Sequence, residues 1–134
     1  MSADPHDLIR RFVEGLSRGD LPDDLFTNDL MVWTTPSGTE APKAQYQGAV
    51  RLLQSLFPQG LRYTLDWAIA EGNRGAAEVR SHGVLASGEE FAARYAFMFG
   101  FCDSRIATLA EHTDPRPVEQ KIMGPLMAAM AQAG

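Results

Sequence analysis

The sequence contains very little cysteine: Cys102 is the only one among 134 residues. A single cysteine excludes an intrachain disulfide and a zinc site built from several thiolates, and it fits a reducing compartment. No apolar run approaches the roughly 20 residues that a membrane helix needs. The N-terminus also lacks the basic and then apolar segments of a secretory signal. We therefore expect a cytoplasmic protein that neither spans nor binds a membrane.

Positive charge is scarce as well. The chain has 12 Lys and Arg against 17 Asp and Glu, which gives a net charge of −5, and no run of basic residues forms a track for phosphates. We therefore expect no nucleic-acid partner. The histidines and carboxylates show none of the spacings typical of zinc sites, so we expect no metal. A length of 134 residues with 45% apolar residues is enough for one domain, residues 1–134, with its own core.

The hydrophobic pattern changes period along the chain. The first part has a period near 3.6 and predicts helices at 4–19 and 46–57, with a short helix near 20–26 and a strand at 30–35. The second part has a period of 2 and predicts strands at 61–70, 76–86, 91–101 and 105–112, followed by a helical tail at 118–133. Tight turns make neighbouring strands antiparallel. Helices segregated from such a meander indicate an α+β fold.

Three stretches resemble the NTF2-like superfamily, and within it the SnoaL-like group. Residues 25–38 are similar to the family's passage from helix to first strand, and residues 78–99 to its central hairpin. Residues 103–114 resemble its Asp-Gly-Lys-Ile and Glu-Tyr-x-Asp segments, with Ser104 in place of Gly and His112 in place of Tyr. The resemblance implies a cone-shaped barrel, in which N-terminal helices close a curved antiparallel sheet around a pocket. It also implies a homodimer that forms through the outer face of the sheet.

The candidate catalytic residues lie on two of the predicted strands. Strand alternation places Glu78, Arg80 and His82 on one face. Similarity to the epoxide-hydrolase-like relatives implies that Glu78 and Arg80 face the pocket together with Glu111. Arg80 would keep one carboxylate ionised as a base, while burial would let the other deliver a proton; His82 is a further proton carrier. The same residues also fit a structural ion-pair network, and both interpretations stay open.

Aromatic residues are the candidates for contact with a ligand. We expect five of them to line the pocket: Trp33, Tyr95, Phe97, Phe12 and Trp67. Such side chains also serve as ordinary core residues, so their pattern alone does not separate the two roles.

Two functions from different classes follow. The leading hypothesis is an enzyme without a cofactor that uses acid–base chemistry, of isomerase, cyclase or hydrolase type, on a small apolar organic molecule. The alternative is a non-catalytic small-molecule-binding or accessory domain. The first strand favours the alternative, because it lacks the Tyr and Asn of the epoxide hydrolases and has Thr35 where ketosteroid isomerases have Asp. A third possibility is an interaction module that uses the open sheet face.

Overall fold

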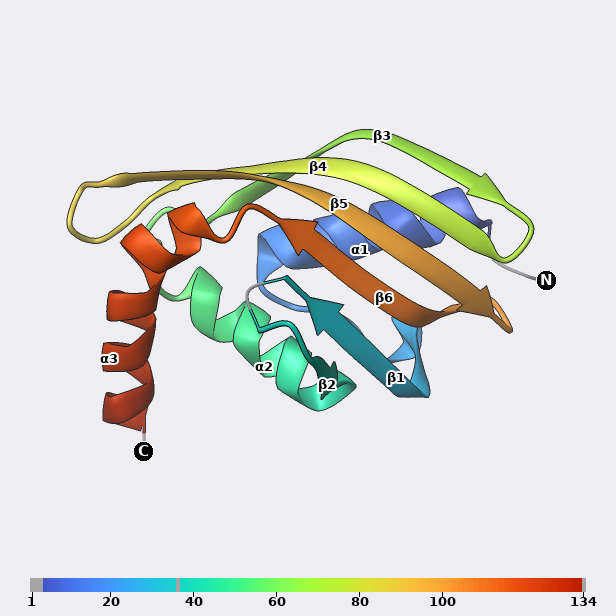
Figure 1. Cartoon of the computed structure of the whole chain (residues 1–134), viewed down its shortest axis with the longest axis horizontal. Coiled ribbons are helices and arrows are strands. Elements are labelled where there is room, and N and C mark those ends of the chain that lie inside the picture. The colour runs from blue at the N-terminus through green and yellow to red at the C-terminus, as the bar shows by residue number, and fades with distance from the viewer. Residues whose placement is uncertain (1–3, 36, 134) are drawn as a thin grey trace.

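The computed structural model describes residues 4–35 and 37–133. Figure 1 shows a strongly curved sheet that lies over two helices, with a third helix at the C-terminal end. The predicted α+β architecture is confirmed. The elements in chain order are α1 (Pro5–Arg18), the 3-10 turn η1 (Asp23–Leu25), β1 (Phe26–Thr34), β2 (Glu40–Pro42), α2 (Lys43–Gln54), β3 (Arg62–Glu71), β4 (Arg74–Val84), β5 (Glu90–Cys102), β6 (Arg105–Thr113), the π turn η2 (Val118–Ile122) and α3 (Met123–Ala133).

The first helix has the ends that its sequence predicts. Asp4 accepts a hydrogen bond from the backbone N–H of His6 at 3.0 Å, and Pro5 occupies the first helical position. Gly19 ends the helix in the left-handed region, with φ of 69°. The apolar stripe of α1 is buried beneath the sheet and consists of Leu8, Ile9, Phe12, Val13 and Leu16.

The sheet has six strands in the order β2-β1-β6-β5-β4-β3. Strands β3 to β6 form the predicted antiparallel meander. In contrast to the prediction, one pair is parallel: β1 lies beside β6, which follows it after α2 and the meander. Strands β2 and β3 form the two edges, so the sheet curves without closing into a hydrogen-bonded barrel.

Several element boundaries differ from the sequence prediction. Strand β1 begins at Phe26, where it pairs with Ile106, and β2 lies in a segment predicted as a loop. The short helix is a single turn, Asp23–Leu25. The predicted helical tail consists of the π turn η2 followed by α3, and Pro125 lies in the first turn of α3, where a missing N–H is tolerated.

The core lies between the concave face of the sheet and the helices α1 and α2. Alternate residues of β5 point into it and are buried: Phe91, Ala93, Tyr95, Phe97 and Phe99. Phe12 of α1 packs edge-on against Phe97 and Phe99, with ring centroids 5.1 and 5.5 Å apart. Within residues 4–35 and 37–133, none of the helices is long and apolar enough to cross a membrane.

Candidate functional site

A carboxyl group lies in this apolar interior. Glu111 of β6 is the register partner of the fully buried Phe97, so its side chain points to the concave face. The hydroxyl of Tyr46, in the first turns of α2, donates a hydrogen bond to Glu111 Oε1 at 2.9 Å. None of the Lys, Arg or His side chains that the structure describes forms an ion pair with Glu111. The carboxyl group is therefore supported by a hydroxyl and not by a counter-charge.

Burial changes the acidity of this group. Glu111 is half-buried, and its carboxyl group points to the concave face of the sheet. Desolvation raises the pKa of the Glu111 carboxyl above its ordinary value, and the hydrogen bond from Tyr46 offsets part of this rise. Such a carboxyl group keeps its proton to a higher pH than a surface glutamate does, which suits a group that both accepts and returns protons.

Three further hydroxyl groups lie near the carboxyl group. The hydroxyls of Ser81 on β4 and Tyr95 on β5 are 2.8 Å apart. The ring centroid of Tyr63, on β3, is 5.6 Å from that of Tyr95. Burial raises the pKa of both phenols, and the charge of Glu111 raises it further, so both stay neutral hydrogen-bond donors. Together with Tyr46 and Glu111 these residues form what we call the Glu111 cluster.

Hydrogen bonds between strands hold the backbone beneath this cluster. The backbone N–H of Thr35 donates to the carbonyl oxygen of Glu111 at 3.0 Å, and the Thr35 hydroxyl donates to the same oxygen at 3.3 Å. The Thr35 hydroxyl also accepts from the N–H of Thr113 at 3.2 Å. The end of β1 is thus tied to β6 at Glu111 and at Thr113, which fixes the position from which the carboxyl group projects.

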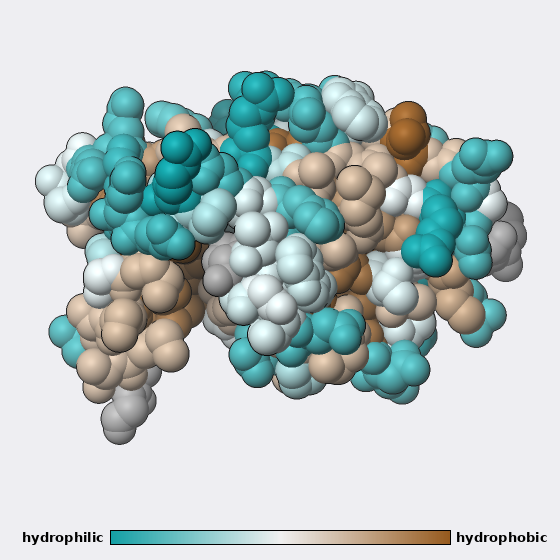
Figure 2. All heavy atoms as spheres, in the orientation of Figure 1, coloured by the Kyte–Doolittle hydropathy of each residue, from teal (hydrophilic) through white to brown (hydrophobic). Residues whose placement is uncertain are grey.

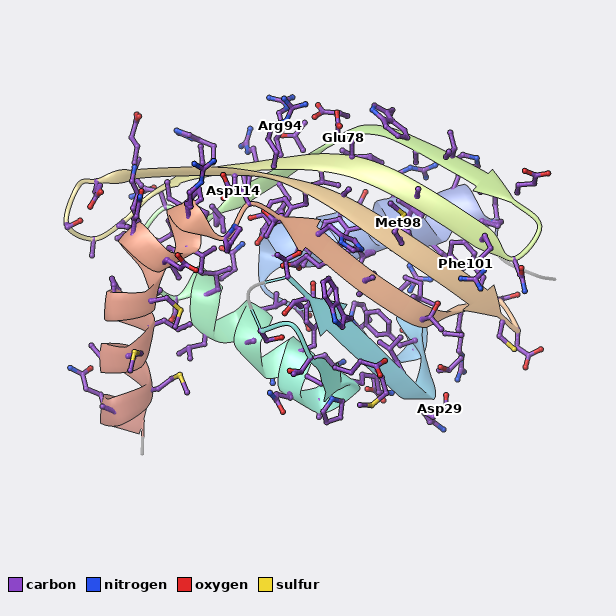
Figure 3. All side chains as sticks on the ribbon, in the orientation of Figure 1. Asp29, Glu78, Arg94, Met98, Phe101 and Asp114 are labelled. Atoms are coloured by element: carbon purple, nitrogen blue, oxygen red, sulfur yellow. The ribbon has the colours of Figure 1, made fainter. Side chains whose placement is uncertain are left out.

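The predicted site of Glu78, Arg80 and Glu111 is wrong in its geometry. Glu78, Arg80 and His82 do share one face of β4, but it is the outer face, and Glu78 rises from the sheet on the side away from the helices (Figure 3). The buried positions of β4 are the alternate ones: Ala77, Val79, Ser81 and Gly83. An alignment error of one residue moves every side chain of a strand to the opposite face.

The outer carboxylates pair with arginines instead. Arg80 donates to both oxygens of Asp66, with the Nε–Oδ2 distance at 2.8 Å. Arg94 Nη2 lies 3.1 Å from Glu78 Oε1. The Arg80 guanidinium lowers the pKa of the Asp66 carboxyl, which keeps it ionised. Exposed pairs of this kind add little stability, so this network neither braces the interior nor supplies a proton carrier to Glu111.

The aromatic candidates also divide between the two faces. Phe12 and Phe97 are fully buried in the core, and Tyr95 belongs to the Glu111 cluster. Trp67 is half exposed on the outer face, because a bulge between Leu65 and Trp67 reverses the alternation of β3. On the same face Trp33 contacts the ring of His112, with centroids 5.0 Å apart.

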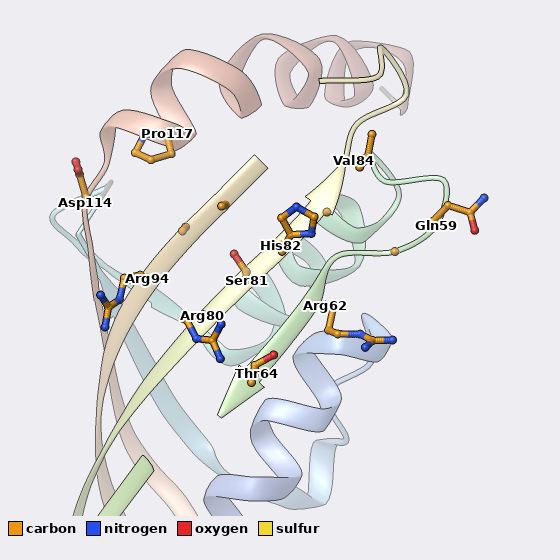
Figure 4. Close-up of a pocket in the computed structure, with 14 residues that line it drawn as sticks. Gln59, Arg62, Thr64, Arg80, Ser81, His82, Val84, Arg94, Asp114 and Pro117 are labelled. Atoms are coloured by element: carbon orange, nitrogen blue, oxygen red, sulfur yellow. The ribbon is translucent and has the colours of Figure 1, made fainter. Parts of the chain in front are cut away.

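A hollow lies on the outer face as well. It has a volume of about 820 Å³, opens to solvent, and lies over β4 and β5 near the hairpin that joins them (Figure 4). Glu111 does not line it. In the part of the chain that the structure describes, no three His, Cys, Asp or Glu side chains gather closely enough to hold a metal ion.

Comparison with known proteins identifies the domain type. The sequence model of the SnoaL-like domain matches residues 9–109. No protein of curated function matches the sequence.

Solved structures resemble the whole chain. Wild-type IdmH, a proposed polyketide cyclase from Streptomyces antibioticus, superposes with a TM-score of 0.76 at 18% identity, over 96% of this chain and 99% of that one. A proposed SnoaL-like polyketide cyclase from Jannaschia sp. CCS1 gives 0.73 at 16% identity, over 93% and 99%. AclR, a proposed hydroxylase from Streptomyces galilaeus, gives 0.73 at 16% identity, over 92% and 95%. At these identities the likeness shows a common fold.

Proposed function

The chain belongs to the SnoaL-like domain family, and we propose that it is an enzyme without a cofactor that performs acid–base chemistry on a small apolar organic molecule, with Glu111 as its proton carrier. One observation carries the proposal: the half-buried Glu111 points to the concave face, where desolvation raises the pKa of its carboxyl group, and it has the Tyr46 hydroxyl as its side-chain partner in place of a cation. The two similar structures named as polyketide cyclases fit this type of chemistry.

Energetic cost separates this arrangement from ordinary core packing. A buried carboxylate without a counter-charge destabilises the folded state, and an apolar residue or a glutamine at the same position would destabilise it less. Ionisable groups with perturbed pKa values of this kind concentrate at functional sites. A role in proton exchange would therefore explain why the chain keeps a destabilising carboxyl group at Glu111.

The chemistry follows from the two protonation states of Glu111. In the ionised state it takes a proton from a carbon or from water, and Tyr46 stabilises the charge through its hydrogen bond. In the protonated state it returns that proton to another atom of the same molecule. Tyr63 and Tyr95 stay neutral and suit donation of hydrogen bonds to an oxygen that becomes negative.

The alternative function is binding without conversion. The first strand favours it, because it lacks the Tyr and Asn of the epoxide hydrolases and has Thr35 where ketosteroid isomerases have Asp. Glu111→Gln separates the two functions, since it preserves the shape of the site but cannot carry a proton. An enzyme should lose turnover of small lactones, epoxides or enones and keep its affinity for them. In a binding domain there is no turnover for the substitution to remove.

For assembly, we propose a homodimer through the outer face of the sheet. A row of apolar residues crosses five strands in register there: Ile69, Ala76, Met98, Ala110 and Trp33. Ile69 is 61% exposed and Met98 46%. Hydrophobic residues gather near the middle of the face seen in Figure 2, whereas hydrophilic ones gather over the β4–β5 hairpin at its upper left. A second copy related by a two-fold axis would cover this apolar row.

The same proposal takes residues 1–134 as one SnoaL-like domain that acts in the cytoplasm. The state of the thiol fits that location, because Cys102 is free and exposed.

A further inference from the structure

The hollow on the outer face of the sheet is lined by residues other than Glu111. Its floor is formed by β4 and β5, and Figure 4 shows Arg62 and Gln59 on one side and Asp114 and Pro117 on the other. We call it the outer hollow. Ser81 belongs to the Glu111 cluster and also lines the hollow, but Glu111 does not, so the charged lining needs an explanation other than the proposed chemistry at Glu111.

Positive side chains are concentrated in the outer hollow. In the register of the sheet Arg80 lies directly opposite Arg94, and Arg62 lies directly opposite His82. Like charges at opposite positions of two strands, as at Arg80 and Arg94, destabilise their pairing. Three arginines and a histidine thus meet at one place in a chain whose net charge is −5. Such a cluster costs stability unless something negative binds between its members.

The nearby carboxylates do not neutralise this cluster completely. Asp66 and Glu78 pair with Arg80 and Arg94, but neither carboxylate lines the hollow. Asp114 does line it, and its carboxylate is occupied by Arg116 at 2.7 Å.

Two of these four side chains lack a close counter-ion. Arg62 has no ion pair among the residues that the structure describes. His82 has only a distant one, 4.0 Å from Glu90 Oε1. Both line the hollow, so the guanidinium of Arg62 is available to a negatively charged ligand.

We propose that the outer hollow binds the oxyanion group, carboxylate or phosphate, of a small organic molecule. The planar guanidinium of arginine matches the geometry of both oxyanions and can donate two parallel hydrogen bonds to either. Val84, Ala92 and Pro117 line the hollow beside the charges and leave room for a short carbon body. The ligand class is therefore a small anion with an apolar part.

This site does not compete with the proposed dimer surface. The row that contains Arg80 and Arg94 is four residues from the row that contains Ala76 and Met98, which is about 13 Å along the strands. The outer face thus has an apolar half and a cationic half. The proposed dimer contact and the outer hollow are therefore centred on different halves of the outer face.

Calorimetric titration with inorganic phosphate and, separately, with succinate tests the site. At least one of the two probes should bind saturably to the parent protein. Arg62→Gln should weaken that binding about tenfold, since it removes a charge-assisted hydrogen bond. The matched control is Arg18→Gln on the exposed side of α1, which should bind like the parent, and so should Glu111→Gln. Arg62 is exposed, so equal melting temperatures will show that its variant is folded.

The outcomes decide both the site and its ligand. Binding of phosphate alone assigns a phosphate ester, and binding of succinate alone assigns a carboxylate. Binding of both assigns an oxyanion site that does not distinguish them. The proposal is wrong if neither probe binds saturably, if Arg62→Gln binds as tightly as the parent, or if Arg18→Gln weakens binding to the same extent.

Discussion

The Tyr46 hydroxyl and the Glu111 carboxyl group meet in the interior at 2.9 Å, although the two residues are 65 positions apart in sequence. The contact joins α2 to β6 and gives the buried carboxyl group its side-chain hydrogen-bond partner. Desolvation raises the pKa of Glu111, and this contact moderates the rise. The stability and the chemistry of the domain are therefore both linked to one proton.

Glu111→Gln should change how stability depends on pH. The unfolded chain releases the Glu111 proton near pH 4.5, whereas the folded state keeps it to higher pH. The parent therefore loses free energy of unfolding as the pH rises from 4.5 through the raised pKa of the folded state. Glutamine has no proton to lose, so the variant should gain stability relative to the parent over that window.

Urea unfolding across the pH range measures this difference. Glu119→Gln is the control, because Glu119 is exposed and has no ion pair among the residues that the structure describes. Its curve should run parallel to that of the parent. If the Glu111→Gln curve is also parallel to the parent's, the Glu111 carboxyl group is not desolvated in the folded state.

Tyr46→Phe should raise the pKa of Glu111 further. The substitution removes the hydrogen bond that lowers this pKa and leaves burial, which raises it. It should also destabilise the fold by about 1–3 kcal/mol, because a buried acceptor loses its partner. The carboxyl carbon shift of Glu111 in an NMR titration reports the pKa. Tyr63→Phe is the comparison, and a Glu111 pKa that stays constant or falls in Tyr46→Phe would be inconsistent with the hydrogen bond.

Ile69→Asp should dissociate the proposed dimer. The substitution places a charge in the exposed apolar row that crosses the outer face of the sheet. Thr64→Asp is a matched control, since it lies on the same strand and the same face but outside the row. Sedimentation equilibrium should show a dimer for the parent and for Thr64→Asp, and a monomer for Ile69→Asp. A parent that is a monomer at micromolar concentration excludes this assembly.

Local signals in the sequence were sufficient for most elements of the fold. Asp4, Pro5 and Gly19 mark the ends of α1, and the large aromatic residues at alternate positions of β5 mark its buried face. The period of the hydrophobic pattern and the turn residues then predict the antiparallel meander of β3 to β6. The parallel pairing of β1 with β6 was not predicted, because it depends on the path of the chain through α2 and the meander.

The candidate site was harder to predict, because the inner face of β4 carries only small residues. Val79, Ser81 and Gly83 leave room for the aromatic residues opposite, and a Cβ at Gly83 would lie 2.8 Å from the ring of Phe57. The alternation of charged and small residues on β4 indicated the buried face, but the alignment with the epoxide-hydrolase-like relatives assigned the charged face to the pocket. The bulge before Trp67 has no sequence signal of its own. The partner of Glu111 could not be predicted either, since Tyr46 is distant in sequence and carried no motif.

The most direct test of the central claim is proton exchange catalysed by Glu111. The parent and Glu111→Gln are incubated in D₂O with small ketones, lactones and enones, and the loss of C–H signals is followed by proton NMR. A proton carrier exchanges an acidic C–H of a bound molecule even where no net reaction follows. We predict that the parent accelerates exchange for at least one compound and that Glu111→Gln falls to the uncatalysed rate. Exchange by Glu111→Gln at the parental rate, or no acceleration by the parent for any compound, would contradict the claim.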